Sequence, residues 1–251
     1  MKCYVLTFSL LFLSLASLGQ DVNAMLKEAA RLEMVPDEKA ALAKYKEILK
    51  IYPIQLFAIC RSSELCSRIG KRQTDSKLRN DYFDAAVTYA NIGLKVSPDD
   101  SEANCVMAIA QGRSSMSKSG KEKINNAREI KKYLDKSLRK DSTNYKAWHV
   151  LGRWHYEISN LNILERAAVN LLYGGVPSAS IKESVRCFEK ARLLAPWFIL
   201  NYFEMARAYY DNDDKAKAKE YINKMLTLPN VTEDDPGIKE NGKTLLKIMQ
   251  R

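Results

Sequence analysis

Histidine is scarce in this chain, and no motif of catalysis or nucleotide binding is present. The two histidines, His149 and His155, do not converge on one helix face as the pair of a zinc-binding HExxH motif does. Gly-x-Gly-x-x-Gly, Gly-x-x-x-x-Gly-Lys-Ser/Thr and Gly-x-Ser-x-Gly are also missing. We therefore expect no catalytic residue, no metal site and no cofactor, and an enzyme is the least favoured class of function.

Glycine and proline are also few, with 10 and 7 residues among 251. An all-β fold needs many tight turns, so their scarcity favours helices. What the chain has in excess is positive charge, with a formal net charge of +10. Such a charge suits acidic partners, or it simply keeps the protein dispersed in solution.

Residues 1–20 have the pattern of an export signal. Lys2 is followed by an apolar run from Tyr4 to Leu18, and small residues precede Gln20 at the spacing that a signal peptidase requires. We expect cleavage near Gly19, and a periplasmic or secreted protein. The alternative is an N-terminal membrane anchor that is not cleaved.

The four cysteines that follow the predicted signal show no CxxC spacing. Cys60, Cys66, Cys105 and Cys187 all lie within apolar helical patterns. An exported protein can form disulfides. We nevertheless predict buried free thiols, because the cysteines occupy positions typical of small core residues.

The clearest pattern in the chain is one tetratricopeptide (TPR) unit within residues 145–196. Trp-x-x-Leu-Gly marks its first helix, and a small residue followed by Phe-x-x-Ala and a closing proline marks its second. The structural residues of this repeat are Trp148, Leu151, Gly152, Phe188, Ala191 and Pro196. An apolar insertion at 159–180 separates the two helices, which a short turn normally joins.

Weaker copies of the same two-helix pattern occur before and after this unit. A helix over residues 55–70 is predicted to end at Gly70 as a left-handed cap. Residues 229–251 are predicted to form the C-terminal capping helix, with Thr232 as the cap of a helix from Glu233 to Met249. Because one helix pair cannot bury its apolar face alone, the pairs must stack. We predict an all-α, TPR-like solenoid of antiparallel helix pairs over residues 21–251.

Several segments of this chain resemble the regulator of microtubule dynamics family. The segments that carry the resemblance include Ala147–Trp154, Leu164–Ala168, Ser184–Phe188 and Leu228–Asp235. It implies an all-helical TPR-like domain. It also implies the roles associated with that family, which are contact with microtubules and spindle poles and, in one branch at mitochondrial contact sites, phospholipid binding and transfer.

The concave side of the solenoid is the predicted binding groove. If Trp148 and Tyr202 set the register of their helices, one wall is lined by Lys146, His149, Arg153, Tyr156, Phe203, Arg207 and Tyr210. Arginines and aromatic rings on one wall suit a ligand with a carboxylate or phosphate and an apolar body. The alternative is that these residues serve ordinary packing between helices and solvation.

Two functions are consistent with this fold. The first is a non-enzymatic adaptor whose groove binds a protein or peptide, an inference from the fold. The second is a carrier of phospholipid or another hydrophobic ligand, with the insertion 159–180 as a lid. The basic segment 118–140 could meet acidic protein tails or an anionic membrane surface, although a solvated face is favoured. Nucleic acid is disfavoured, because few aromatic residues accompany those charges.

Overall fold

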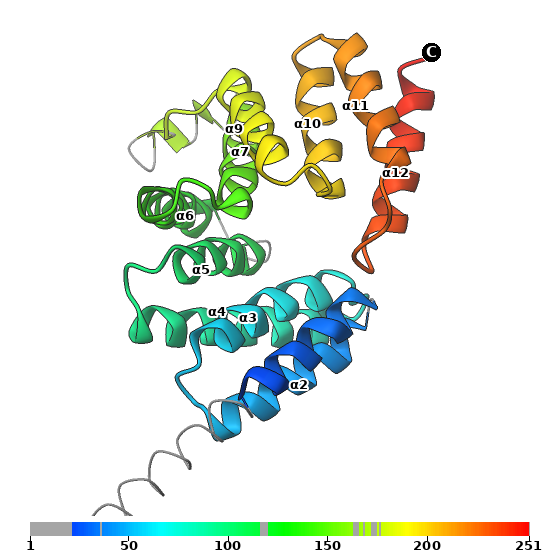
Figure 1. The fold of residues 1–251 in the computed structure, drawn as a ribbon. Helices are drawn as coiled ribbons and strands as arrows, with labels where there is room; N and C mark the ends of the chain where they lie inside the picture. Colours follow the sequence, from blue (N-terminus) through cyan, green and yellow to red (C-terminus); the bar gives the residue numbers. More distant parts are fainter. Residues whose placement is uncertain are drawn as a thin grey trace, which may run out of the picture.

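The computed structural model describes residues 22–35, 37–115, 120–162, 166–167, 169–171, 175 and 177–250, and the regular elements in these ranges are helices (Figure 1). The predicted signal at 1–20 lies outside them. After a helix over residues 22–34 come α2 (Glu38–Ile51), α3 (Leu56–Lys71), α4 (Ser76–Val96), α5 (Ser101–Ser114), α6 (Gly120–Lys140), α7 (Tyr145–Ser159), α9 (Ile181–Leu194), α10 (Ile199–Asp211), α11 (Lys215–Thr227) and α12 (Asp235–Ile248).

The helices form consecutive pairs, α3 with α4, α5 with α6, α7 with α9, and α10 with α11. The first helices of successive pairs also contact one another, from α3 through α5, α7 and α10 to α12. Each second helix contacts its own partner and the first helix that follows. The first helices therefore line the inner side of a curved stack. Figure 1 shows the chain curving until α12 approaches α2 and α3 again. The predicted all-α helix-pair solenoid is confirmed.

Close approach within the central pair depends on Gly152 of α7. A Cβ atom at this position would lie 2.7 Å from Cδ1 of Phe188 on α9. The Ser184 hydroxyl donates a hydrogen bond of 2.8 Å to the Gly152 carbonyl, and Phe188 and Ala191 are fully buried. The small residue, the ring and the hydroxyl together hold the two helices in contact, although an insertion separates them in sequence.

Gly70 has the same role in the pair of α3 and α4, and its predicted role as a helix cap is wrong. Helix α3 continues to Lys71, and Gly70 is buried within it. A Cβ atom there would lie 2.8 Å from Cε1 of Phe83 on α4. Glycine is therefore required at this position by close packing, and not by a left-handed backbone.

The start of the last helix also differs from the prediction. Helix α12 begins at Asp235, and residues 229–234 precede it as a loop. The Thr232 side chain does not cap it. Instead the Asp235 carboxylate accepts backbone hydrogen bonds from Val231 (2.8 Å) and Thr232 (2.7 Å). This carboxylate fixes the turn that leads into α12.

The two outer markers of the predicted repeat lie at the surface. Trp148 is half-buried, and its indole N–H donates to the Ser142 carbonyl at 2.8 Å. The Arg186 guanidinium lies 5.8 Å from the centre of the Trp148 ring. Pro196 is exposed just after α9, and its carbonyl accepts a hydrogen bond of 3.0 Å from the Tyr202 hydroxyl.

The cysteines of the described chain are buried and form no disulfide, as predicted. Burial raises the pKa of Cys60 and of Cys187 to about 12, so both are thiols at neutral pH. No helix within the described ranges is both long and apolar enough to cross a membrane. The insertion between Ser159 and Ile181 lies partly outside the described residues, and its role as a lid stays a prediction.

Candidate functional site

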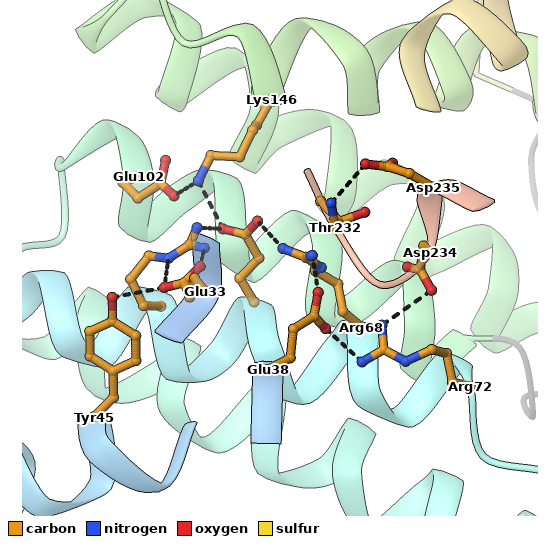
Figure 2. Close-up of polar contacts among 12 residues, drawn as sticks. Glu33, Glu38, Tyr45, Arg68, Arg72, Glu102, Lys146, Thr232, Asp234 and Asp235 are labelled. Atoms are coloured by element: carbon orange, nitrogen blue, oxygen red, sulfur yellow. Dashed lines mark hydrogen bonds and ion pairs between the residues drawn. The ribbon is translucent and has the colours of Figure 1, made fainter. Parts of the chain in front are cut away.

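A network of ion pairs covers the inner side of α3 (Figure 2). Residues of α3 supply one side of it, and neighbouring helices supply the other. Its members are Arg61, Glu64 and Arg68 of α3, Arg72 at the C-terminal end of α3, Glu33 of the first helix, Glu38 of α2, Glu102 of α5 and Lys146 of α7. Because the α3 residues recur three to four positions apart, their side chains share one helix face.

Lys146, a predicted groove residue, is part of this network. Its ammonium lies 2.9 Å from Oε2 of Glu64 and also pairs with Glu102. Burial opposes ionisation of Glu64, but Arg61 and Lys146 outweigh it and hold the pKa of Glu64 well below its usual value. Each of these cations has a carboxylate partner. The network therefore ties helix pairs together, and breaking a buried pair of this kind typically costs about 3–5 kcal/mol.

The loop before α12 joins the same network from the other end of the chain. The Arg72 guanidinium lies 3.2 Å from Glu233 and 3.2 Å from Asp234. Glu233 also accepts a hydrogen bond of 2.7 Å from the backbone N–H of Glu38. These contacts connect the last helix to α2 and α3 and close the curve of the stack.

A second set of charges lies on the first helices. Unlike the network, it consists of cations alone. In each of four first helices a small residue is followed directly by a cation: Gly70–Lys71 in α3, Gly112–Arg113 in α5, Gly152–Arg153 in α7 and Ala206–Arg207 in α10. The glycines face the partner second helix, as the Cβ positions show. The next residue is turned by about 100° around the helix axis, away from that partner. We call Lys71, Arg113, Arg153 and Arg207 the inner cation row.

Three members of the inner cation row act on one another electrostatically. Burial lowers the pKa of Lys71, and the charges of Arg113 and Arg153 lower it further. Burial, followed by the charge of Arg153, lowers the pKa of Arg113 to about 10. With a pKa of about 10, Arg113 is still charged at neutral pH. The row therefore concentrates positive charge on one wall.

Among the described residues, the carboxylates near the row pair with only two of its four members, Arg207 and Arg153, and Arg153 also lies 3.4 Å from Glu157. Glu204 lies 2.9 Å from Arg207 and 3.6 Å from Arg153, and Asp234 is paired with Arg72. Within the described part of the chain, neither Lys71 nor Arg113 forms an ion pair within 4.0 Å. An anion that approached this wall would meet cations that still lack a close partner.

Three of the predicted groove residues lie together at the α7–α10 end of the row. The Tyr156 hydroxyl donates to Asp211 at 2.5 Å and accepts from Arg207 at 3.2 Å. The Arg207 guanidinium lies 4.8 Å from the centre of the Tyr156 ring, and Arg153 reaches the same Glu204 as Arg207. Arg153, Tyr156 and Arg207 therefore form one connected group.

His149 does not line the groove, contrary to the prediction. Its side chain is enclosed by Phe188 and Phe198, with ring centres 5.6 and 4.8 Å away. Its Nδ1 lies 3.0 Å from the Asn201 oxygen, and the Asn201 amide donates to the Phe188 carbonyl. His149 Nδ1 must therefore carry the proton in that contact. Burial lowers the pKa of His149 to about 4, so the ring is neutral at pH 7.

Phe203 and Tyr210 are half-buried against the core of α10, α11 and α12. The residues that the sequence analysis missed are Lys71 and Arg113. The repeated dipeptide of a small residue and a cation on every inner helix would have identified both.

Two other predictions concern the basic segment 118–140 and metal binding. The basic face of α6 is solvated and partly paired within the helix, with Lys131 2.8 Å from Asp135 and Lys132 3.5 Å from Glu129. In the ranges that the structure describes, no group of three or more potential ligands could hold a metal ion.

Comparison with known proteins gives the family of this fold. The family model described as regulator of microtubule dynamics protein 1-3 matches residues 25–250. The chain belongs to the regulator of microtubule dynamics family. It is 34% identical to regulator of microtubule dynamics protein 1 of Caenorhabditis elegans over 51% of this chain and 56% of that protein. It is 28% identical to protein 3 of Xenopus laevis over 72% of this chain and 38% of that one.

Regulator of microtubule dynamics protein 2 of Homo sapiens is 30% identical over 64% of this chain and 40% of its own length. The chain thus spans between 38% and 56% of the length of these family members. A crystal structure of a thermophilic TPR protein of Thermus thermophilus has the same fold. It aligns with a TM-score of 0.65 at 13% identity, over 90% of this chain and 99% of that one.

Proposed function

We propose that this member of the family is a non-enzymatic scaffold that binds a segment of another protein on its inner face. The observation that carries the proposal is the inner cation row. Lys71 and Arg113 are held near Arg153 without a close carboxylate, although like charges at short range repel. If Lys71 and Arg113 served stability alone, pairing them with carboxylates would stabilise the fold further, as the ion pairs on the neighbouring face of α3 do.

The geometry of the stack supports a protein segment as the ligand. The first helices succeed one another along the inner wall, and four of them carry a cation directly after a small residue. TPR-like stacks commonly use such walls as interaction surfaces, and that part of the support is an analogy between folds. The names of the relatives connect them with microtubule dynamics, and we propose that this chain acts by binding a protein partner.

Panning of a displayed library of random dodecapeptides against the purified full-length chain tests the proposal. Enriched peptides are expected to lose binding to a variant with Arg113→Gln and Arg153→Gln. They are expected to keep binding to a matched variant with Lys182→Gln and Lys190→Gln, which alters exposed residues of α9. Enrichment of peptides that bind both variants equally would place the binding surface elsewhere and contradict the proposal.

We also propose that residues 1–20 direct export of the chain. The support is the order of a basic residue, an apolar run and small residues in the sequence. Sequencing of the N-terminus of the mature protein tests this. A start near Gln20 is expected after cleavage, and a start at Met1 would indicate the N-terminal anchor instead.

A further inference from the structure

We infer that the inner cation row binds an extended acidic segment, with carboxylates spaced about three residues apart. This inference rests on the proposed function and names the class of partner. The charge of the row, the spacing of the inner helices and the acidic loop of the chain itself support it.

Arg113 lies in the row without a carboxylate of its own. The charge of Arg153 acts on it, and the carboxylates that act on it are Asp234 and Glu204. Both of these are committed to other arginines, Asp234 to Arg72 and Glu204 to Arg207. A ligand carboxylate would add the missing partner, and charge-assisted hydrogen bonds from arginine to carboxylate are among the stronger polar contacts in proteins.

At the separation typical of packed helices, the first helices would match about every third residue of an extended chain. Lys71, Arg113, Arg153 and Arg207 stand on α3, α5, α7 and α10, which contact one another in that order. Packed helices lie about 8–10 Å apart. An extended chain rises about 3.3 Å per residue, so about three residues span one step. A segment that follows the wall therefore presents every third side chain to a new cation.

The loop before α12 shows how an acidic segment sits on this surface. Residues 229–234 are not helical, and Glu233 and Asp234 place their carboxylates 3.2 Å from Arg72, the neighbour of Lys71 in sequence. The charge of Asp234 also acts on Lys71 and Arg113. Non-helical backbone that carries carboxylates is thus already accommodated at the α3 end of the row. We infer that the ligand continues in the same manner toward α10.

Fluorescence anisotropy with three labelled dodecapeptides tests the inference on the full-length chain. The first is Glu-Ser-Ser repeated four times, the second replaces each Glu by Gln, and the third has four consecutive Glu followed by eight Ser. We expect the first peptide to bind at least tenfold more tightly than the second and about threefold more tightly than the third. Raising the salt concentration from 0.1 to 0.5 M should weaken its binding severalfold, because exposed charges are screened.

Matched variants then locate the binding. Replacing Arg113 and Arg153 by Gln is expected to weaken binding of the spaced acidic peptide at least tenfold. Replacing Lys182 and Lys190 of α9 by Gln changes the net charge equally and is expected to weaken it less than twofold. Circular dichroism and a thermal unfolding curve establish that both double variants are folded.

The outcomes separate this inference from the proposed function. Equal binding of the Glu and Gln peptides, or an equal loss of peptide affinity in the two double variants, would overturn the inference that the ligand is acidic. If panning still yields neutral peptides whose binding needs Arg113 and Arg153, the inner face binds protein and only the acidic class is wrong. If panning yields no peptide that depends on this face, the proposed function fails as well.

Discussion

At the scale of single residues, Gly152 fixes how closely α7 and α9 approach. Replacement of Gly152 by Ala would put a methyl group 2.7 Å from Cδ1 and 3.1 Å from Cγ of Phe188. The Phe188 ring is fully buried, so moving it would disturb the packing of the core. We expect the free energy of unfolding, measured in urea, to fall by about 1–3 kcal/mol.

Gly237 provides a matched control for Gly152. It lies inside α12, and a Cβ atom added to it would have no neighbouring atom within 4 Å. Alanine is the better helix former by about 1 kcal/mol, so Gly237→Ala should leave stability unchanged or raise it. Equal losses in the two variants would show that close packing against Phe188 is not what requires a glycine at 152.

The buried His149 predicts a dependence of stability on pH. Its folded pKa is about 4, whereas the ordinary value is 6.5. The unfolded chain therefore binds a proton at this residue that the folded chain rejects between these values. The contribution to stability is fully present above pH 6.5 and is lost as the pH falls toward 4. The total is about 3 kcal/mol, since each pKa unit corresponds to about 1.36 kcal/mol.

Urea unfolding at several pH values between 7.5 and 4.5 measures this effect. His149→Gln keeps an amide donor for Asn201 and removes the titrating ring. The stability of the wild type should fall more steeply with decreasing pH than that of the variant. Parallel curves would mean that the ring is protonated, or reaches solvent, in the folded protein.

Residue roles were predictable where they depend on helix spacing alone. The pattern of Gly152 and Phe188 shows which side of each helix meets the partner helix. The same spacing cannot show whether a polar side chain meets solvent. His149 is enclosed by Phe198 and Asn201, which come about fifty residues later in the chain, and its burial could not be inferred from its own helix.

At the scale of the helix, Asn144 joins the start of α7 to the preceding pair. Its side chain accepts from the Ala147 backbone N–H at 3.0 Å and donates to the Ser101 hydroxyl at 3.0 Å. Asn144→Ala should lower the free energy of unfolding by about 2 kcal/mol, because both the cap and a buried contact are lost. Asp75→Ala removes an exposed cap of α4 that bonds only Leu78, and about 1 kcal/mol is expected. Equal losses of unfolding free energy in the two variants would show that the buried contact between Asn144 and Ser101 does not contribute to stability.

Helix ends were predicted less well than helices. Gly70 is a common type of helix stop, but Phe83 requires a glycine inside α3, and local sequence does not distinguish these causes. Thr232 followed by acidic residues is typical of a helix start. The helix begins instead at Asp235, whose carboxylate binds the loop behind it. In both cases a contact outside the local pattern decides the boundary.

At the scale of the whole molecule, the loop before α12 holds the two ends of the stack together. Replacing Glu233 by Gln and Asp234 by Asn removes the two carboxylates of this loop that pair with Arg72, and leaves its pair with Glu38 in place. Because Glu233 also accepts from the Glu38 backbone N–H, we expect that amide to exchange its hydrogen about fivefold faster, which corresponds to about 1 kcal/mol. Hydrogen exchange followed by mass spectrometry or NMR measures this rate.

The control changes the same number of charges away from the contact. Glu220→Gln with Glu240→Gln alters exposed residues of α11 and α12. Exchange at Glu38 should not change in that variant. This closure could not be predicted from the sequence, because Arg72 and Asp234 are 162 positions apart and no repeat pattern relates them.

Arginine footprinting tests the central claim, that the inner face is the binding surface, most directly. The full-length chain is treated with phenylglyoxal in the presence and absence of a peptide selected by panning, and modification is measured at each arginine by mass spectrometry. We predict that the peptide protects Arg113, Arg153 and Arg207 and leaves the exposed Arg186 of α9 unprotected. Unchanged modification of the three inner arginines, or protection of Arg186 in their place, would contradict it.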